Sequence, residues 1–179
     1  GTDELGRDVL SRVVYGARIS LRVGLIAVGI GLVVGSAMGL IAAYFGGWLD
    51  TVIMRIMDVL LAFPGILLAI AIIAVLGPSL NNVMIAIGIE LIPIYTRTAR
   101  ASTLSVKELE YVVGAKSIGS RSGRILIKHI LPNIVAPLIV LATIGVAGSI
   151  LTAAGLSYLG LGAQPPTAEW GAMLSSARS

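Results

Sequence analysis

The chain has 179 residues, of which 56% are hydrophobic and only 12% charged, and its mean hydropathy is +0.97. A soluble domain carries about 25% charged residues, so this composition excludes a protein that faces water on all sides. Because there is no cysteine, disulfides and thiolate metal sites are excluded as well. His129 is the single histidine, which argues against any local metal site.

Three long stretches, residues 23–49, 59–89 and 130–168, contain no charged side chain. A bilayer core about 30 Å thick needs about 20 apolar residues in helix, so each stretch can hold a membrane span. The sequence therefore predicts an all-α polytopic membrane protein, a transmembrane helix bundle forming a single domain. The spans are expected at residues 19–45, 51–76, 83–101 and 133–154.

Small residues and one proline mark the first two spans. Gly31, Gly35 and Gly39 follow one another at every fourth position, which lets helices approach closely in lipid. Pro64 lies inside the second span and is expected to kink it, because its ring blocks a backbone hydrogen bond.

The cations predict the orientation of the chain. More than half of the thirteen Lys and Arg lie between residues 97 and 128. Cytoplasmic loops carry such an excess, so this connection is expected inside the cell. Alternation then places the turn at 46–50 inside. The segments expected outside are residues 1–18, the turn at 77–82 and residues 155–179.

The cytoplasmic connection, residues 108–131, has the pattern of two short amphipathic helices joined at Gly119, which permits a sharp turn. Pro132 is expected to end the second helix at the membrane. The first apolar face consists of Leu109, Val112 and Val113; in the second helix Arg121, Arg124 and Lys128 lie opposite Ile127, Ile130 and Leu131.

Two interpretations of this helix pair stay open on the residues alone. The helices could lie flat on anionic lipid headgroups, as basic amphipathic helices do. They could equally be a docking element for a cytoplasmic partner. A nucleic-acid partner is disfavoured, because the basic loop has no interleaved aromatic residue beyond Tyr111.

Several segments carry a family resemblance: "VGA" at 113–115 followed by Gly119 and "HILPN" at 129–133, together with "GTDELGRDVLSR", "YGARISL", "AYFGGWLD", "MRIMDVLLAFPGILLA" and "LSYLGLGAQPPTAEWGAML". They resemble the permeases of ABC importers, in particular the second membrane subunit of the dipeptide/oligopeptide/nickel subfamily. Val113 and Gly114 stand where the family's coupling motif has Glu and Ala, and Ile92 where it has Trp. Family members usually have one more span at each end, so the chain is expected to be a fragment without the first and last spans.

The resemblance implies a type I ABC importer permease fold in a bacterial or archaeal cytoplasmic (inner) membrane. It implies a homologous permease subunit, two cytoplasmic ATPases and an extracytoplasmic substrate-binding protein as partners. Short peptides are the first expected substrate, and nickel or a nickel chelate is the alternative. The coupling residues that it implies are Glu110, Val113, Gly114, Ala115, Gly119, Arg121, Arg124, His129, Leu131 and Pro132.

No catalytic residue is expected in this chain. It has no G-x-x-x-x-G-K-[ST] motif, so ATP and Mg are expected on the partner ATPase and no cofactor on the permease itself. Two alternative functions of another class are an ion channel and a non-transporting membrane scaffold. A channel calls for a polar stripe along a helix, which the sequence does not display.

Glu90 is the one acidic residue expected deep in a span, seven residues or about 10 Å from Arg97. A charge there is expensive in lipid and often functional. Glu90 is therefore a candidate substrate-pathway residue. Tyr95 is a second candidate, for which the alternative is a residue of the aromatic belt at the membrane interface. The alternatives for Glu90 are a structural partner for an arginine or a buried neutral carboxyl. Arg55 and Asp58 are expected to form an ion pair within one helix.

Overall fold

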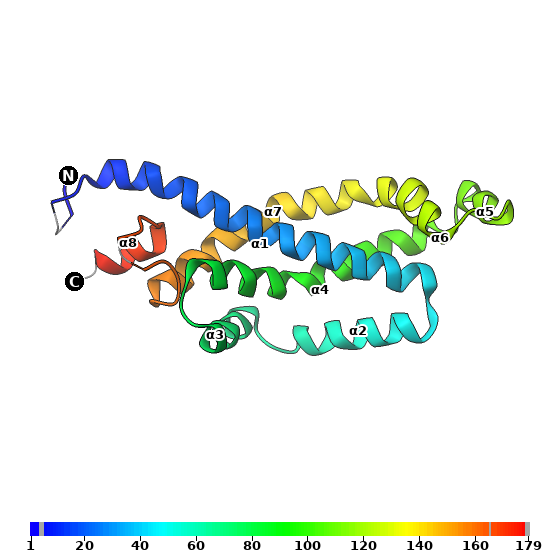
Figure 1. Ribbon diagram of the computed structural model, residues 1–179, viewed down its shortest axis with the longest axis horizontal. Helices are drawn as coiled ribbons and strands as arrows, with labels where there is room; N and C mark the ends of the chain where they lie inside the picture. Colours follow the sequence, from blue (N-terminus) through cyan, green and yellow to red (C-terminus); the bar gives the residue numbers. More distant parts are fainter. Residues whose placement is uncertain (4–5, 165, 178–179) are drawn as a thin grey trace. The chain divides into compact units, whose positions relative to one another are not determined.

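The computed structural model describes residues 1–3, 6–164 and 166–177. These residues form helices and no named strand, which confirms the all-α prediction (Figure 1). In chain order the helices are α1 (Val9–Phe45), α2 (Gly47–Leu61), α3 (Gly65–Leu76), α4 (Leu80–Val106), α5 (Glu110–Ser117), α6 (Ser122–Arg124), the π-helix η1 (Ile125–Ile130), α7 (Leu131–Tyr158) and α8 (Trp170–Ser176).

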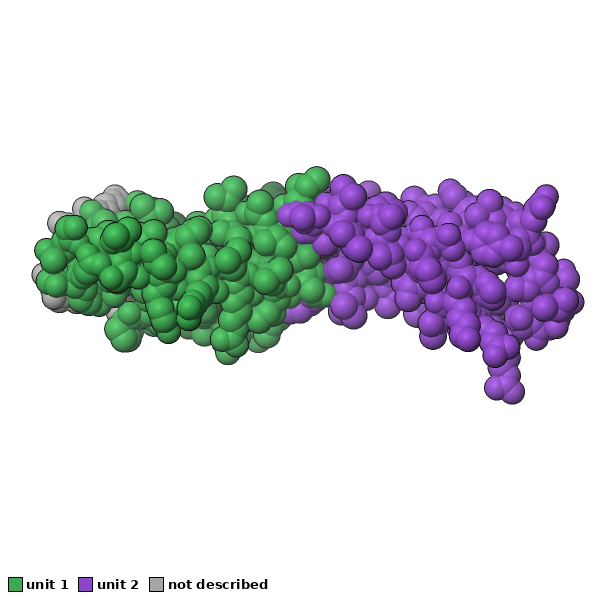
Figure 2. Space-filling view, turned by 90° about the horizontal axis from the view of Figure 1, so that it is seen from above, with its two compact units in different colours: residues 1–29, 63–90, 144–179 green, residues 30–62, 91–143 purple. Residues whose placement is uncertain are grey.

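The chain forms two compact units, coloured separately in Figure 2. Helices α1, α4 and α7 each contribute one part to each unit. Unit 1 consists of residues 1–29, 63–90 and 144–179, and unit 2 of residues 30–62 and 91–143. Unit 1 thus contains the segments predicted to lie on the outer side of the membrane. Unit 2 contains the turn and the loop predicted to lie on the cytoplasmic side.

Two helices, α1 and the continuous run from Ser122 to Tyr158, are long and apolar enough to cross a membrane. Helices α2 and α3 would add a third span if the pair forms one crossing. These helices make the chain a multi-pass membrane protein. Polar residues such as Asn82, Glu90 and Arg97 lower the hydropathy of α4, which is not among these spans, so the four-span arrangement stays a prediction.

The second predicted span is interrupted rather than kinked. Helix α2 ends at Leu61 and α3 begins at Gly65, and Pro64 between them has a ψ of 128°, outside the helical region. Proline has no N–H to donate, and its ring disfavours helical backbone at the preceding residue, Phe63. The hydrogen-bond ladder therefore stops at this point instead of bending.

The glycine spacing in α1 serves close packing in unit 2, as predicted for Gly35 and Gly39. A Cβ at Gly35 would lie 2.7 Å from the Cβ of Tyr95 in α4. A Cβ at Gly39 would lie 2.9 Å from the Cβ of Ala99 and would overlap the carbonyl oxygen of Thr96. Only glycine lets the two helix backbones come this close.

The ion pair expected within α2 forms between two helices instead. Arg97 of α4 donates from Nη2 to Oδ1 of Asp58 in α2 at 2.7 Å. Within the described residues Arg55 has no salt bridge to Asp58, so the prediction of a local pair is wrong. The local i, i+3 spacing in the sequence does not indicate a partner that lies in a neighbouring helix.

In unit 1 the N-terminal part of α1 contacts the segment before α8. Trp170 Nε1 donates a hydrogen bond to the carbonyl of Val13 at 3.0 Å. Gly16 lies directly against this segment, because a Cβ there would be 2.9 Å from the carbonyl oxygen of Ala168. The two terminal segments predicted to share one side of the membrane are therefore in contact.

Candidate coupling surface

The residue between α4 and the predicted coupling loop, Lys107, is attached to α1. Lys107 Nζ donates a hydrogen bond to the carbonyl of Ala43, in the last turn of α1, at 3.0 Å. A cation at a helix C-terminus also interacts favourably with the helix dipole. No sequence pattern indicated this contact, since the two residues are 64 positions apart.

Helix α5 begins with Glu110 and carries Lys116 in its last turn, charges that suit the two ends of a helix dipole. It ends in a Schellman motif. Gly119 has a φ of +79° and donates to the carbonyl of Lys116 at 3.0 Å, while Ser120 donates to the carbonyl of Ala115 at 3.1 Å. The predicted glycine turn is confirmed, and the left-handed backbone explains why glycine stands there.

The second helix of the loop has a π-helical start, which changes its buried face. Ile125, Ile130 and Ile134 are buried, and they are spaced by five and then by four residues. The amide of Leu131 donates to the carbonyl five residues before it, as in a π-helix. The predicted apolar face followed a 3.6-residue period, and it is wrong for Ile127, whose side chain is 66% exposed.

Pro132 does not end the second helix, contrary to the prediction, because residues 122–158 form one helical run. The wider π-helical turn directly before the proline gives room for its ring, which would clash in a regular α-helical turn. The carbonyl of His129 beside this irregularity accepts the side-chain amide of Asn133 at 2.7 Å and the hydroxyl of Tyr111 at 3.4 Å. This carbonyl oxygen therefore accepts two side-chain hydrogen bonds.

Helix α5 turns one side toward the protein and the other toward solvent. Val112 and Ala115 are buried, and Val112 lines a hollow together with Tyr44, Lys107 and Ile125. Of the predicted apolar face only Val112 is buried, because Leu109 and Val113 are exposed. The prediction of the inward face of α5 is therefore correct at one position of three.

The solvent side of the loop combines apolar and cationic side chains. We call this the coupling surface, and it consists of the exposed residues Leu109, Tyr111, Val113, Ile118 and Ile127 with Lys116, Arg121, Arg124 and Lys128. Ile118 at its tip is 84% exposed. No salt bridge within the described residues uses any of the four cations. Clustered exposed apolar side chains mark interaction sites.

The ten predicted coupling residues all lie between the start of α5 and the start of α7 (Figure 1). Glu110, Val113, Gly114, Gly119, Arg121, Arg124 and Pro132 are exposed, His129 and Leu131 are half-buried, and Ala115 is buried. The His129 ring lies 6.3 Å from the ring of Tyr111, centre to centre. The structure thus gathers these residues in one region, and their contact with an ATPase stays a prediction.

Glu90 and Tyr95 are the tentative pathway residues, and each is packed within its own unit. The carboxyl of Glu90 lies against Gly65, the first residue of α3, so closely that the Cβ of an alanine there would overlap it. A helix N-terminus is a favourable place for a carboxylate. Within the described residues no arginine pairs with Glu90.

Tyr95 packs against Gly35 and is 1% exposed, and its hydroxyl has no hydrogen-bond partner in the part of the chain that the structure describes. Both side chains thus make packing contacts within their own unit, and a role in a substrate pathway stays a prediction. The described residues contain no cluster of His, Cys, Asp or Glu that could hold a metal ion.

The sequence of this chain matches a known protein family and several known proteins. Residues 31–178 match the family described as binding-protein-dependent transport system inner membrane component. The dipeptide transport system permease protein DppC of Alkalihalophilus pseudofirmus is 55% identical over 178 residues, which are 99% of this chain and 59% of that protein.

Two glutathione transport system permease proteins GsiD are similar over all 179 residues of this chain. The protein of Pectobacterium atrosepticum is 51% identical, with 60% of its length covered, and that of Escherichia coli is 54% identical, with 59% covered. The chain therefore spans less than two thirds of the length of these relatives.

Proposed function

The chain belongs to the family of binding-protein-dependent transport system inner membrane components, and on this premise we propose that it acts as the permease subunit of an ATP-driven ABC importer. In this proposal it forms a translocation pathway with a homologous permease subunit in a bacterial or archaeal cytoplasmic (inner) membrane. An extracytoplasmic binding protein delivers the substrate, and two cytoplasmic ATPases, which bind ATP and Mg, supply the energy.

The coupling surface is the observation that carries this proposal. It presents exposed apolar residues and four cations along α5, α6 and η1, whereas a loop that only joins two spans needs neither. Lys107 attaches this loop to the end of α1, and the run from Ser122 to Tyr158 continues into a membrane-spanning helix. A push on α5 would therefore reach two membrane helices directly.

Short peptides are the proposed substrates. The named functions of the relatives, dipeptide and glutathione transport, support this class, because glutathione is itself a short peptide. None of the three relatives described above is named for nickel, so the nickel alternative is not favoured. Their names and the family likewise disfavour an ion channel or a scaffold.

The test is peptide uptake by the full-length permease, assembled with its partner subunits in proteoliposomes. We expect accumulation of radiolabelled L-alanyl-L-alanine that needs the binding protein and hydrolysable ATP. A non-hydrolysable ATP analogue is the matched control and should abolish accumulation. Uptake that continues with the analogue would indicate a channel, and no uptake of any short peptide would contradict the proposed substrate class.

A further inference from the structure

A hollow of about 590 Å³ lies in unit 1 beside the N-terminal part of α1. Arg12, Tyr15 and Ile19 of α1 line it on one side, and Thr167 and Ala168 of the segment before α8 line it on the other. Sites for small molecules usually have volumes of about 300–1,000 Å³. We call it the N-terminal hollow; it shares no residue with the coupling surface.

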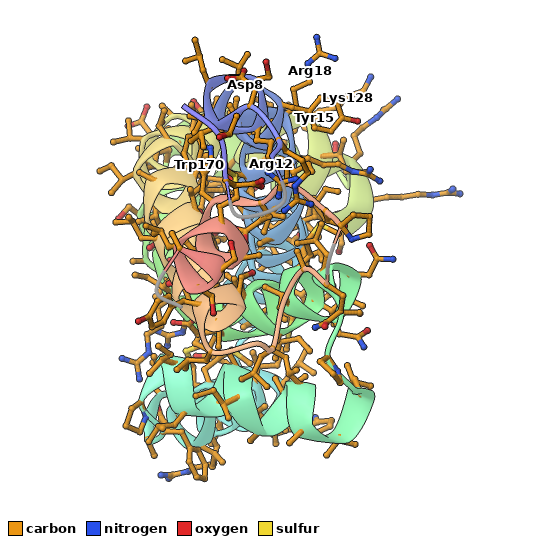
Figure 3. The ribbon with its side chains drawn as sticks, turned by 90° about the vertical axis from the view of Figure 1, so that its left-hand side faces the viewer. Asp8, Arg12, Tyr15, Arg18, Lys128 and Trp170 are labelled. Carbon is orange, nitrogen blue, oxygen red and sulfur yellow. The ribbon has the colours of Figure 1, made fainter. Side chains whose placement is uncertain are left out.

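The far wall of this hollow is fixed to α1 rather than loosely placed. The indole of Trp170 is hydrogen-bonded to the carbonyl of Val13, and Gly16 lets the backbone of Ala168 approach α1 closely. Figure 3 looks onto this end of the chain and labels Arg12 and Tyr15 on α1, with Trp170 near them. The hollow therefore has two walls that hold each other in place.

Arg12 is a recessed cation whose guanidinium has no hydrogen-bond acceptor among the described residues. Its side chain is only 16% exposed, and its sole ion pair among the described residues is a long one, 3.7 Å from Nε to Oδ2 of Asp3. That oxygen already accepts Arg7 Nε at 2.7 Å. A guanidinium has five N–H donors in a planar fork, and those of Arg12 make no hydrogen bond within the described residues.

None of the described residues that line the hollow with Arg12 is acidic. Asp8, the nearest acid along α1, is occupied by Ser11, whose amide and hydroxyl donate to it at 2.8 and 2.5 Å. The two bonds hold the pKa of Asp8 below its usual range. No salt bridge within the described residues joins Asp8 to Arg12. Tyr15 and Thr167, which carry hydroxyl groups, and the apolar Ile19 also line the hollow.

We propose that the N-terminal hollow is a subsite for the carboxylate of a short peptide, with Arg12 as its binding cation. A guanidinium can hold a carboxylate through two parallel hydrogen bonds. Because Arg12 is recessed, a slender ligand reaches it more readily than the flat face of a protein does. The choice of a peptide rests on the proposed function, whereas the site itself rests on the geometry of Arg12.

The position along α1 argues against a site in the lipid core. Helix α1 has 37 residues, which corresponds to about 55 Å at 1.5 Å per residue. This length exceeds a hydrocarbon core of about 30 Å, so the ends of α1 extend beyond it. Arg12 lies one turn from the N-terminal end of the helix and is therefore accessible from water.

The experiment measures ligand binding to the full-length transporter in nanodiscs without the binding protein. Saturation-transfer NMR compares L-alanyl-L-alanine with its C-terminal amide, which lacks the carboxylate. The variants are Arg12→Gln, Arg12→Lys and, as the matched control, Arg18→Gln on an exposed arginine of the same helix. Size-exclusion profiles establish that each variant is folded.

We expect the wild type to bind the acid about ten times more tightly than the amide. The amide lacks the carboxylate and so loses one charge-assisted interaction with Arg12. Arg12→Gln should remove this preference, Arg12→Lys should restore part of it, and Arg18→Gln should leave it unchanged. Equal binding of acid and amide by the wild type would overturn the proposal without the use of any variant. A preference that survives in folded Arg12→Gln would also overturn it. Peptide uptake in proteoliposomes, measured separately, would then decide whether the proposed function stands without this subsite.

Discussion

Arg100 of α4 and Asp50 of α2 form an ion pair with two hydrogen bonds. Nε of Arg100 donates to Oδ1 of Asp50 and Nη2 donates to Oδ2, each at 2.6 Å. The side chains are 32% and 19% exposed, so both are largely shielded from water. A planar two-bond pair of this kind is stronger and more directional than a single-bond contact.

Replacement of Asp50 by asparagine should destabilise the protein by roughly 1–3 kcal/mol, because it leaves the guanidinium of Arg100 without its charged partner. The matched control is Asp58→Asn, which breaks a single-bond pair whose side chains are 52% and 48% exposed. That change should cost less than about 1 kcal/mol. SDS titration of the full-length permease in mixed micelles measures both free energies of unfolding. Equal losses in the two variants would contradict this ranking.

Gly39→Ala should destabilise the protein by about 1–3 kcal/mol, the usual cost of overpacking. The new methyl group would press on the backbone of α4 at Thr96, which cannot move without shifting the helix. Gly29→Ala is the control in the same helix, because a Cβ there meets nothing within 4 Å. It should be neutral or stabilising by up to about 1 kcal/mol. The same SDS titration measures both variants; if Gly39→Ala proved as stable as Gly29→Ala, the close packing of α1 on α4 would be refuted.

The sequence predicted what depends on local chemistry. The apolar stretches gave the helical class, Gly119 gave the turn after α5, and Gly35 and Gly39 gave the face of close approach. Each of these follows from one residue type at one position or spacing. The four cations of the coupling surface were likewise visible in the sequence, because unpaired charges in a short loop stand out against apolar spans.

The contacts that could not be predicted depend on a neighbouring helix or on an irregular turn. Asp58 pairs with Arg97 rather than with Arg55, since a partner on another helix has no signature in sequence spacing. Ile127 lies within the π-helix, which buries Ile125 and Ile130 five residues apart, and a regular 3.6-residue period does not anticipate that spacing. Gly119 predicts the Schellman hydrogen bonds after α5. No pattern in the sequence predicted that the helix continues through Pro132.

Gly119→Pro should abolish ATP-driven uptake while the transporter still inserts into the membrane. Gly119 has a φ of +79°, which proline cannot adopt because its ring holds φ near −65°. The orientation of α5 relative to α6 would therefore be lost. Gly123→Ala is the control, since a Cβ at Gly123 meets nothing within 4 Å. Proteoliposome uptake and membrane extraction are the two measurements, and normal transport by Gly119→Pro would refute the coupling role.

Ile118→Ser should weaken the binding of the ATPase without lowering stability. The side chain is 84% exposed at the tip of the coupling surface, so it contributes little to folding and much to a buried contact. Leu174→Ser is the control, because Leu174 is also exposed but belongs to α8 and not to the loop. Titration of purified ATPase onto permease in nanodiscs should give a Kd raised about tenfold for Ile118→Ser alone. An unchanged Kd would show that the tip of the loop lies outside the contact.

The most direct test of the coupling surface is co-purification of the ATPase with the full-length permease, before and after deletion of residues 110–131. Gly119→Pro serves as a second variant, because it removes no residue of the loop. The account predicts that the ATPase is recovered with the wild type and lost with both variants, while the partner permease is retained. Recovery of the ATPase with the deletion variant would contradict it and would leave the loop as a helix pair on the lipid surface.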